Sequence, residues 1–237
     1  MLNRLKWDSD FWDLEIADLH FENDNFEAEE HNFFDYDIIQ SKVEINKKKI
    51  INFLESKKFN FINLEISLVR NLSNYNYKRS QFEIAQKKDI DDVCLIASNV
   101  FEKSRFDVFE RLTNQKISNF YSLWVKKSVL GTFDDCCIIE RNDQNKIIGF
   151  ITLKFLNDDS AEIGLLGVKK NNQGLGIGSK LLSSAYKLLK EKKIERLIVS
   201  TQGTNYNALN FYYKNNFKLN KINSWYYKIN KFNKDLI

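Results

Sequence analysis

A glycine-rich segment between a strand pattern and a helix pattern constrains this chain more than any other feature. Three of the eight glycines, Gly174, Gly176 and Gly178, lie within five residues. The apolar residues 161–168 before them are typical of a strand, and residues 178–192 have the apolar spacing of a helix. Glycine lets backbone N–H groups face a ligand with no Cβ in the way, and the first N–H groups of a helix lack internal partners. The segment therefore predicts an anion-binding turn that suits a pyrophosphate.

Other interpretations of the same segment are a turn without a ligand and two known phosphate-binding motifs. The first stays open on these residues alone. A dinucleotide-binding motif needs G-x-G-x-x-G, but Gly174 and Gly176 are followed by Ser179 in the third glycine position. A nucleotide P-loop needs Lys followed by Ser or Thr, but Lys180 is followed by Leu181. Neither phosphate motif fits.

Composition and charge narrow the classes of function. A net charge of +4, from 36 basic and 32 acidic residues, is too small and too scattered to indicate nucleic-acid or membrane binding. With two histidines and no C-x-x-C spacing, we expect no metal site. The adjacent Cys136 and Cys137 point to opposite faces of a strand, so we expect buried, unpaired thiols. A charged N-terminus without a long apolar run predicts no signal peptide, no membrane span and a cytoplasmic location.

The chain of 237 residues is long enough for two domains. The polar residues 71–78 form the best candidate junction. We therefore expect a small α/β domain at 1–78 and a larger domain at 79–237. In the small domain the pattern predicts a helix at 44–57 and a strand at 59–69.

The second block alternates between strand and helix patterns. A hairpin comes first and a strand–loop–helix–strand unit follows, which indicates a mixed sheet of the α+β class. Asp89 is expected to be the N-cap of the first helix. The expected strands are 81–86, 136–140, 147–156, 161–168, 196–201 and 224–229, and the expected helices are 89–101, 117–129, 178–192 and 207–215.

Two motifs resemble those of the GCN5-related N-acetyltransferase (GNAT) superfamily. Gln173, Gly176 and Gly178 match its Q/R-x-x-G-x-G/A motif. Residues 205–217 resemble its N-x-x-A-x-x-x-Y-x-x-x-G-F motif, with Asn216 where glycine is usual. Asparagine tolerates the left-handed conformation needed at a helix C-terminus, so this departure is mild.

The resemblance implies the fold, the cofactor and the site. We expect a GNAT-type mixed, mostly antiparallel sheet flanked by helices, with acetyl-CoA as cosubstrate and no metal. The strand at 161–168 would diverge from its neighbour and bind the pantetheine arm, and the glycine turn would bind the pyrophosphate. The implied cofactor-binding residues are Leu166, Gly167, Val168, Gln173, Gly174, Leu175, Gly176, Ile177, Gly178, Ser179 and Asn205.

The resemblance also implies a catalytic residue. Tyr212 matches the family tyrosine that is commonly assigned as the proton donor to the departing thiolate. By spacing alone, a tyrosine at this helical position is usually core packing. Tyr213, on another face of the helix, is its natural control. Glu162 is a candidate for a general base acting through water, or it is a solvated strand carboxylate.

The resemblance extends to the branch of the family that N-acetylates dTDP-fucosamine, a dTDP-linked amino-deoxy sugar, for surface polysaccharide. It rests on residues 5–12, 104–106, 121–124 and 131–134. It implies a nucleotide-sugar acceptor, to whose site the small domain at 1–78 would contribute. Trp7, Trp12, Arg105 and Phe106 are candidates on the acceptor side, although the two tryptophans suit packing equally well. Another amine or peptide acceptor, and a non-catalytic CoA-binding module, remain alternatives. The oligomeric state is left open, with a homodimer among the options.

Overall fold

The computed structural model describes residues 1–22, 33–73, 81–101 and 113–230. The chain forms two compact units. The first comprises Met1–Ser67, Thr201–Tyr206 and Asn220–Ile237, and the second comprises Leu68–Ser200 and Asn207–Leu219. Three strands, β4, β9 and β10, contribute residues to both units.

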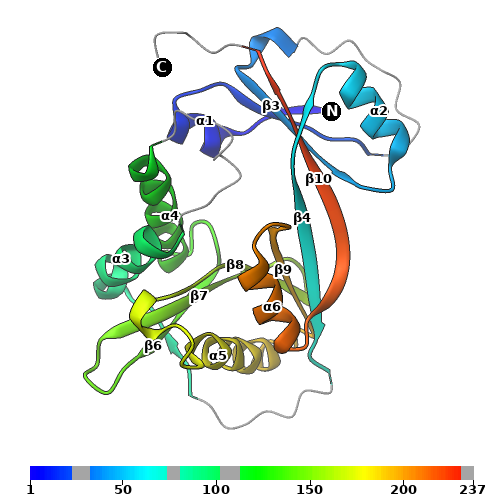
Figure 1. The fold of residues 1–237 in the computed structure, drawn as a ribbon. Helices are drawn as coiled ribbons and strands as arrows, with labels where there is room; N and C mark the ends of the chain where they lie inside the picture. Colours follow the sequence, from blue (N-terminus) through cyan, green and yellow to red (C-terminus); the bar gives the residue numbers. More distant parts are fainter. Residues whose placement is uncertain (23–32, 74–80, 102–112, 231–237) are drawn as a thin grey trace. The chain divides into compact units, whose positions relative to one another are not determined.

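The first unit contains a sheet with the strand order β1-β2-β3-β10-β4 (Figure 1). Strands β2 and β3 are parallel, and β3 pairs with β10 in the antiparallel direction. This second pairing joins Glu44 to Asn223, residues from opposite ends of the chain. The elements are β1 Leu2–Arg4, α1 Lys6–Trp12, β2 Ile16–Leu19, η1 Phe33–Asp35, β3 Ile38–Glu44, α2 Lys48–Ser56, β4 Asn60–Asn71 and β10 Lys218–Ile229.

The core of the first unit lies between α2 and this sheet. Ile50 and Leu54, four residues apart on α2, are buried on one face of the helix. They belong to one apolar cluster with Ile39 and Val43 of β3 and Tyr226 of β10. Burial of this face stabilises a nine-residue helix that is too short to be stable alone.

The second unit contains a sheet with the order β4-β9-β8-β7-β6-β5. Its pairings from β5 to β8 are antiparallel, and β8 pairs with β9 in the parallel direction. This mixed, mostly antiparallel sheet flanked by helices confirms the predicted fold class. The elements are β5 Glu83–Ile84, η2 Lys87–Asp89, α3 Ile90–Val100, α4 Asn114–Val129, β6 Cys136–Arg141, β7 Ile147–Phe155, β8 Ser160–Val168, η3 Lys170–Asn172, α5 Ile177–Glu191, β9 Arg196–Gln202 and α6 Tyr206–Lys214.

Helices cover both faces of this sheet (Figure 1). Two neighbouring residues of β7 show which helix lies on which face, because their side chains point in opposite directions. Phe150 packs in a cluster with residues of α3 and α4. A Cβ on Gly149 would instead meet Leu181 and Ile177 of α5, at 3.1 and 3.2 Å. The helices α3 and α4 therefore lie on one face and α5 on the other.

Several element bounds differ from the sequence predictions: α4 begins at Asn114 and not at 117, α2 spans Lys48–Ser56 and not 44–57, and β5 is only Glu83–Ile84 of the expected 81–86. Three further differences have identifiable reasons. The strand expected at 224–229 is longer, because β10 begins at Lys218 among polar residues that show no apolar alternation. The elements before residue 44 were not predicted, because β1 and β2 are only three and four residues long. Asp89 precedes α3 as expected, but its side chain makes no cap hydrogen bond to that helix.

The carboxylate of Asp89 instead joins β6 to the chain before α3. It accepts hydrogen bonds from the backbone N–H of Gln86 at 2.8 Å and from Arg141 Nη2 at 2.7 Å. Arg141 also pairs with the more exposed Glu83 at 3.0 Å. Burial of Asp89 opposes ionisation, but the Gln86 N–H and the Arg141 guanidinium outweigh it, so the pKa of Asp89 lies below its usual value.

We expect Asp89→Ala to lower the free energy of unfolding by about 2–3 kcal/mol at pH 7, because it leaves a partly buried guanidinium without its buried partner. Glu83→Ala is the control and should cost about 0.5 kcal/mol, since its side chain is 48% exposed. A lowered folded pKa means that the Asp89 contribution is complete above the unfolded value of about 4 and disappears as the pH falls through the folded value. Urea unfolding of both variants at several pH values tests this, and equal losses at pH 7 would contradict it.

Candidate active site

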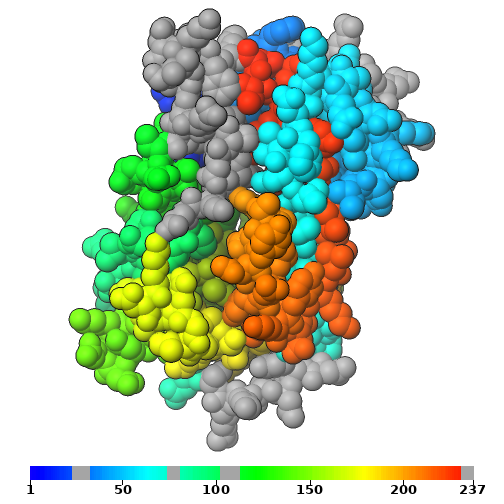
Figure 2. All heavy atoms as spheres, in the orientation of Figure 1, coloured from blue at the N-terminus to red at the C-terminus, as the bar shows by residue number. Residues whose placement is uncertain are grey.

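The glycine turn lies between η3 and α5 in the second unit. Gly174 and Gly176 have φ of +77° and +80°, a region in which other residues are strained. A Cβ at either position would meet no atom of the described residues within 4 Å, so conformation and not crowding explains these glycines. Gln173 to Gly176 are exposed, and Leu175 is 69% exposed. Figure 2 shows this part of the second unit, in yellow, at the surface.

The turn directs the start of a long helix toward solvent. Gly176 is the N-cap of α5, which has 15 residues, and it has no side chain with which to cap the first turn. The first turn contains no acidic residue. The partial positive charge at this helix end is therefore not offset by a side chain of the same turn, which favours an anion there.

Three elements meet beside the turn. The amide Nε2 of Gln173 donates to the carbonyl of Val168 at 3.0 Å, which fixes the turn to the end of β8. A Cβ on Gly178 would lie 3.0 Å from the ring of Phe211 on α6 and 3.8 Å from the side chain of Leu166 on β8. The end of β8, the start of α5 and the middle of α6 are thus packed together.

The pairing of β8 with β9 is short. It runs from Ser160–Arg196 to Ile163–Val199, although β8 itself continues to Val168. In the described strands, residues 164–168 therefore have no β9 partner in the ladder. This is the divergence expected from the family resemblance.

Tyr212 is buried on α6, with 6% of its surface exposed, whereas Tyr213 is 47% exposed. The ring of Tyr212 packs against Phe211 and Phe217, with centroids 5.1 and 5.2 Å away. Burial, with a smaller contribution from Tyr186, raises the pKa of Tyr212 well above its usual value of about 10. The phenol therefore keeps its proton at neutral pH, as a proton donor must.

The end of α6 follows the second motif. Asn216 takes the place of the usual glycine and adopts φ of +60°, which confirms the expected left-handed conformation. The N–H of Phe217 donates to the carbonyl of Tyr212 at 3.0 Å, and the N–H of Asn216 donates to that of Tyr213 at 3.0 Å. These bonds satisfy carbonyls that the helix end leaves unpaired.

With this geometry established, comparison with known proteins gives the family. Residues 100–217 match the Acetyltransferase (GNAT) family. The chain belongs to the GNAT acetyltransferases. Enzymes of this family use acetyl-CoA as the acetyl donor.

Individual relatives agree with this assignment. The chain is 28% identical over 190 residues to the dTDP-fucosamine acetyltransferase of Escherichia coli O6:H1, covering 80% of this chain and 81% of the relative. A GCN5-related N-acetyltransferase from Sphaerobacter thermophilus has a TM-score of 0.56 at 12% identity, covering 82% of this chain and 60% of that one. A GNAT acetyltransferase from Colwellia psychrerythraea has a TM-score of 0.56 at 13% identity, covering 80% and 65%. The two structural matches show the fold alone.

Two further residues predicted from the sequence, Asn205 and Glu162, lie on different elements of this GNAT protein. Asn205 immediately precedes α6, within the Thr201–Tyr206 segment of the first unit, and its N–H donates to the carbonyl of Gln202 at 2.9 Å. Glu162 on β8 accepts a long hydrogen bond from Ser200 at 3.5 Å. Its role as a base stays a prediction.

The candidates on the acceptor side are only partly described. Trp7 and Trp12 lie on α1, where Phe11 stacks with Trp7 at 6.4 Å and meets Trp12 edge-on at 4.7 Å. Trp12 is buried, so packing accounts for it. Arg105 and Phe106 lie outside the described residues.

The cysteines offer no activated nucleophile. Burial raises the pKa of Cys136 to about 12 and that of Cys137 well above its usual value, and all three thiols are free. Within the described residues no group of His, Cys, Asp or Glu side chains is arranged to hold a metal ion. No helix in the same part of the chain is long and apolar enough to cross a membrane.

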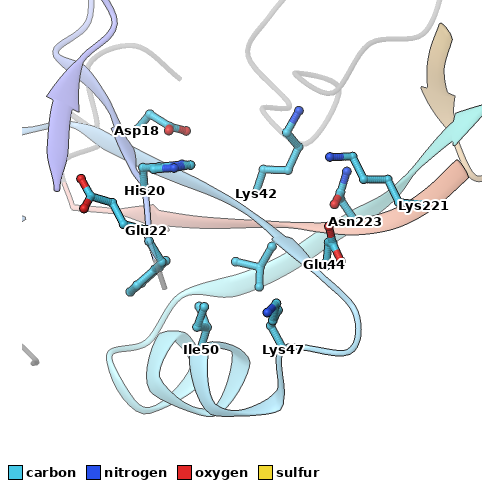
Figure 3. A pocket seen from close by; sticks show the side chains of 11 residues that line it. Asp18, His20, Glu22, Lys42, Glu44, Lys47, Ile50, Lys221 and Asn223 are labelled. Atoms are coloured by element: carbon cyan, nitrogen blue, oxygen red, sulfur yellow. The ribbon is translucent and has the colours of Figure 1, made fainter. Parts of the chain in front are cut away.

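Sequence reasoning missed a pocket of about 270 Å³ in the first unit (Figure 3). It lies near the carboxyl ends of the parallel strands β2 and β3, and β10 also contributes to it. Its charged side chains are three lysines and three carboxylates, so the charges balance and favour neither an anion nor a cation. No local pattern could have found it, since its residues come from distant segments. It is lined by Asp18, His20, Phe21, Glu22, Lys42, Val43, Glu44, Lys47, Ile50, Lys221 and Asn223.

Proposed function

We propose that this GNAT protein transfers acetyl from acetyl-CoA to the amino group of a nucleotide-linked amino-deoxy sugar, with dTDP as the carrier, in surface-polysaccharide synthesis. One observation supports the choice of acceptor. The likeness to the dTDP-fucosamine acetyltransferase covers 190 residues and four fifths of both chains, well beyond residues 100–217 that match the family. It therefore includes sequence outside the family's common domain, where differences in acceptor are expected.

The geometry supports a cofactor position in the second unit. The turn from Gln173 to Ser179 would bind the pyrophosphate with its backbone N–H groups and the positive end of α5. The edge of β8 from Leu166 to Val168 would bind the pantetheine amides, because the β9 ladder ends before it. Asn205 would contact the pantetheine.

The residues of the site suit direct transfer. The neutral amine attacks the thioester carbonyl carbon, a C–N bond forms, and the C–S bond breaks with its electron pair on sulfur. Tyr212 donates its proton to that sulfur, and the proton lost by the new amide nitrogen returns to the phenolate through solvent. No enzyme nucleophile is needed, in agreement with the high pKa of the half-buried Cys136 and the buried Cys137.

The test is to incubate the purified chain with acetyl-CoA and a panel of dTDP- and UDP-linked amino sugars, following thiol release and product mass. We expect turnover with a dTDP-linked 4-amino sugar and none with its 4-hydroxy analogue, which presents the same nucleotide but no amine. Turnover on a polyamine or peptide, with none on any amino sugar of the panel, would overturn the proposed acceptor.

A further inference from the structure

Three polar side chains are buried together in the second unit, between α4 and the β7–β8 pair. Asp134 is 3% exposed, and Thr152 and Ser128 are fully buried. The Oδ2 atom of Asp134 accepts hydrogen bonds from Trp124 Nε1 at 2.9 Å and from Ser128 Oγ at 2.8 Å. Burying a carboxylate costs free energy unless hydrogen bonds compensate it. These two bonds do so, and they fix the position of the Asp134 carboxylate.

Asp134 and Thr152 contact the backbone of β8 where its pairing with β7 is irregular. The register changes between Ile151 and Leu153, where β8 has an extra residue. At this bulge the N–H of Leu165 donates to the side-chain Oγ1 of Thr152 at 2.8 Å. A Cβ on Gly164 would overlap the carboxylate of Asp134 and lie 2.8 Å from Thr152 Oγ1. The carboxylate and the hydroxyl therefore lie directly against the backbone of the bulge.

The bulge follows immediately after the last β8–β9 pair, Ile163–Val199. Beyond that pair, β9 no longer determines the direction of β8. The orientation of the backbone at Gly164 and Leu165 therefore depends on β7, and at this point on the side chain of Thr152. A bulge redirects the groups of a strand, and it commonly does so beside an active site.

We propose that Asp134 and Thr152 are positioning residues: they hold the β8 bulge in the orientation that aligns the acyl group of the bound thioester. This inference rests on the proposed function, in which the thioester lies along β8 beyond the bulge. The pyrophosphate turn is a separate part of the site. Substituting either residue should therefore change the alignment of the acyl group and leave the affinity for the rest of the coenzyme unchanged.

The test compares Thr152→Val with Thr152→Ser. Valine keeps the shape of threonine but leaves the Leu165 N–H without its acceptor, whereas serine keeps the hydroxyl. Calorimetry gives the affinities for CoA and acetyl-CoA, and kinetics with dTDP-4-amino-4,6-dideoxygalactose gives the ratio of kcat/KM for acetyl-CoA to that for propionyl-CoA. For Thr152→Val we expect CoA affinity within about 2-fold of wild type, kcat at least 10-fold lower and an acyl ratio changed at least 3-fold, with recovery in Thr152→Ser.

A second pair covers the case in which Thr152→Val does not fold. Asp134→Ala removes the carboxylate from beneath Gly164, and Asp134→Asn keeps its shape, so only the alanine variant should change the acyl ratio. Thr132→Val is the matched control, because the Thr132 hydroxyl is exposed and donates a hydrogen bond to the carbonyl of Lys127.

The outcomes separate this inference from the proposed function. A lower melting temperature with unchanged kcat and acyl ratio in both Thr152→Val and Asp134→Ala would show a purely structural role and overturn it. If the wild-type chain binds acetyl-CoA but does not acetylate the sugar, the proposed acceptor fails. The ratio of acetyl-CoA to CoA affinity in the variants then still decides the inference, since it needs no acceptor.

Discussion

Tyr212→Phe is expected to lower kcat roughly 10²-fold while leaving the affinity for acetyl-CoA unchanged. The substitution removes the hydroxyl that would protonate the departing thiolate, but it keeps the ring that packs against Phe211 and Phe217. Coenzyme affinity should persist because the pyrophosphate turn is a separate element. The measurement is steady-state turnover with the sugar acceptor, together with calorimetric binding of CoA.

Tyr213→Phe is the matched control for this experiment. It is the same chemical change one residue later, on a side chain that is 47% exposed and points away from the buried face of α6. It should retain wild-type kcat. Equal kcat values for Tyr212→Phe and wild type would remove Tyr212 from the chemistry and leave it as a core residue.

The pH dependence provides an independent check. Because burial raises the pKa of Tyr212 above its usual value of about 10, the phenol stays protonated throughout the range in which an amine acceptor becomes neutral. The wild-type kcat should therefore not fall between pH 8 and pH 10 through ionisation of this group. The ratio of wild-type kcat to that of Tyr212→Phe should be constant over that interval. A ratio that collapses below pH 10 would contradict the assignment.

Gly176→Asp should weaken binding of acetyl-CoA by roughly 10²-fold, because it places a carboxylate within a few ångströms of the expected pyrophosphate. The structure makes this substitution informative. A Cβ at Gly176 meets no atom within 4 Å in the part of the chain that the structure describes, so the new side chain does not crowd those residues. The remaining cost to the protein is the backbone strain at φ of +80°, of the order of 1 kcal/mol.

Gly131→Asp reproduces that strain elsewhere. Gly131 also has a positive φ, +67°, and among the described residues the one atom within 4 Å of its Cβ is the carbonyl oxygen of Asp135 at 3.8 Å. Both variants should lose similar thermal stability, but only Gly176→Asp should lose affinity for CoA in calorimetry. If both variants bind CoA as wild type does, the turn does not hold the pyrophosphate.

The local chemistry of the site was predictable from the sequence because it depends on neighbours along the chain. Glycines at 174 and 176 permit positive φ, the helix begins one residue from the predicted start, and the 3.6-residue period placed Tyr212 on the buried face and Tyr213 outside it. Asn216 could be assigned to the left-handed helix end for the same reason. Each of these properties is decided within a few residues, where steric and hydrogen-bonding rules act directly.

The contacts between distant segments were decided only by the tertiary structure. The pairing of Glu44 with Asn223, the bond from the Leu165 N–H to Thr152, and the carboxylate of Asp134 against Gly164 join residues from 13 to 179 positions apart. The pocket of the first unit combines β2, β3 and β10 in the same way. No local periodicity encodes such contacts, because they depend on which strands pair and in which register, and that is fixed by burial of the whole core.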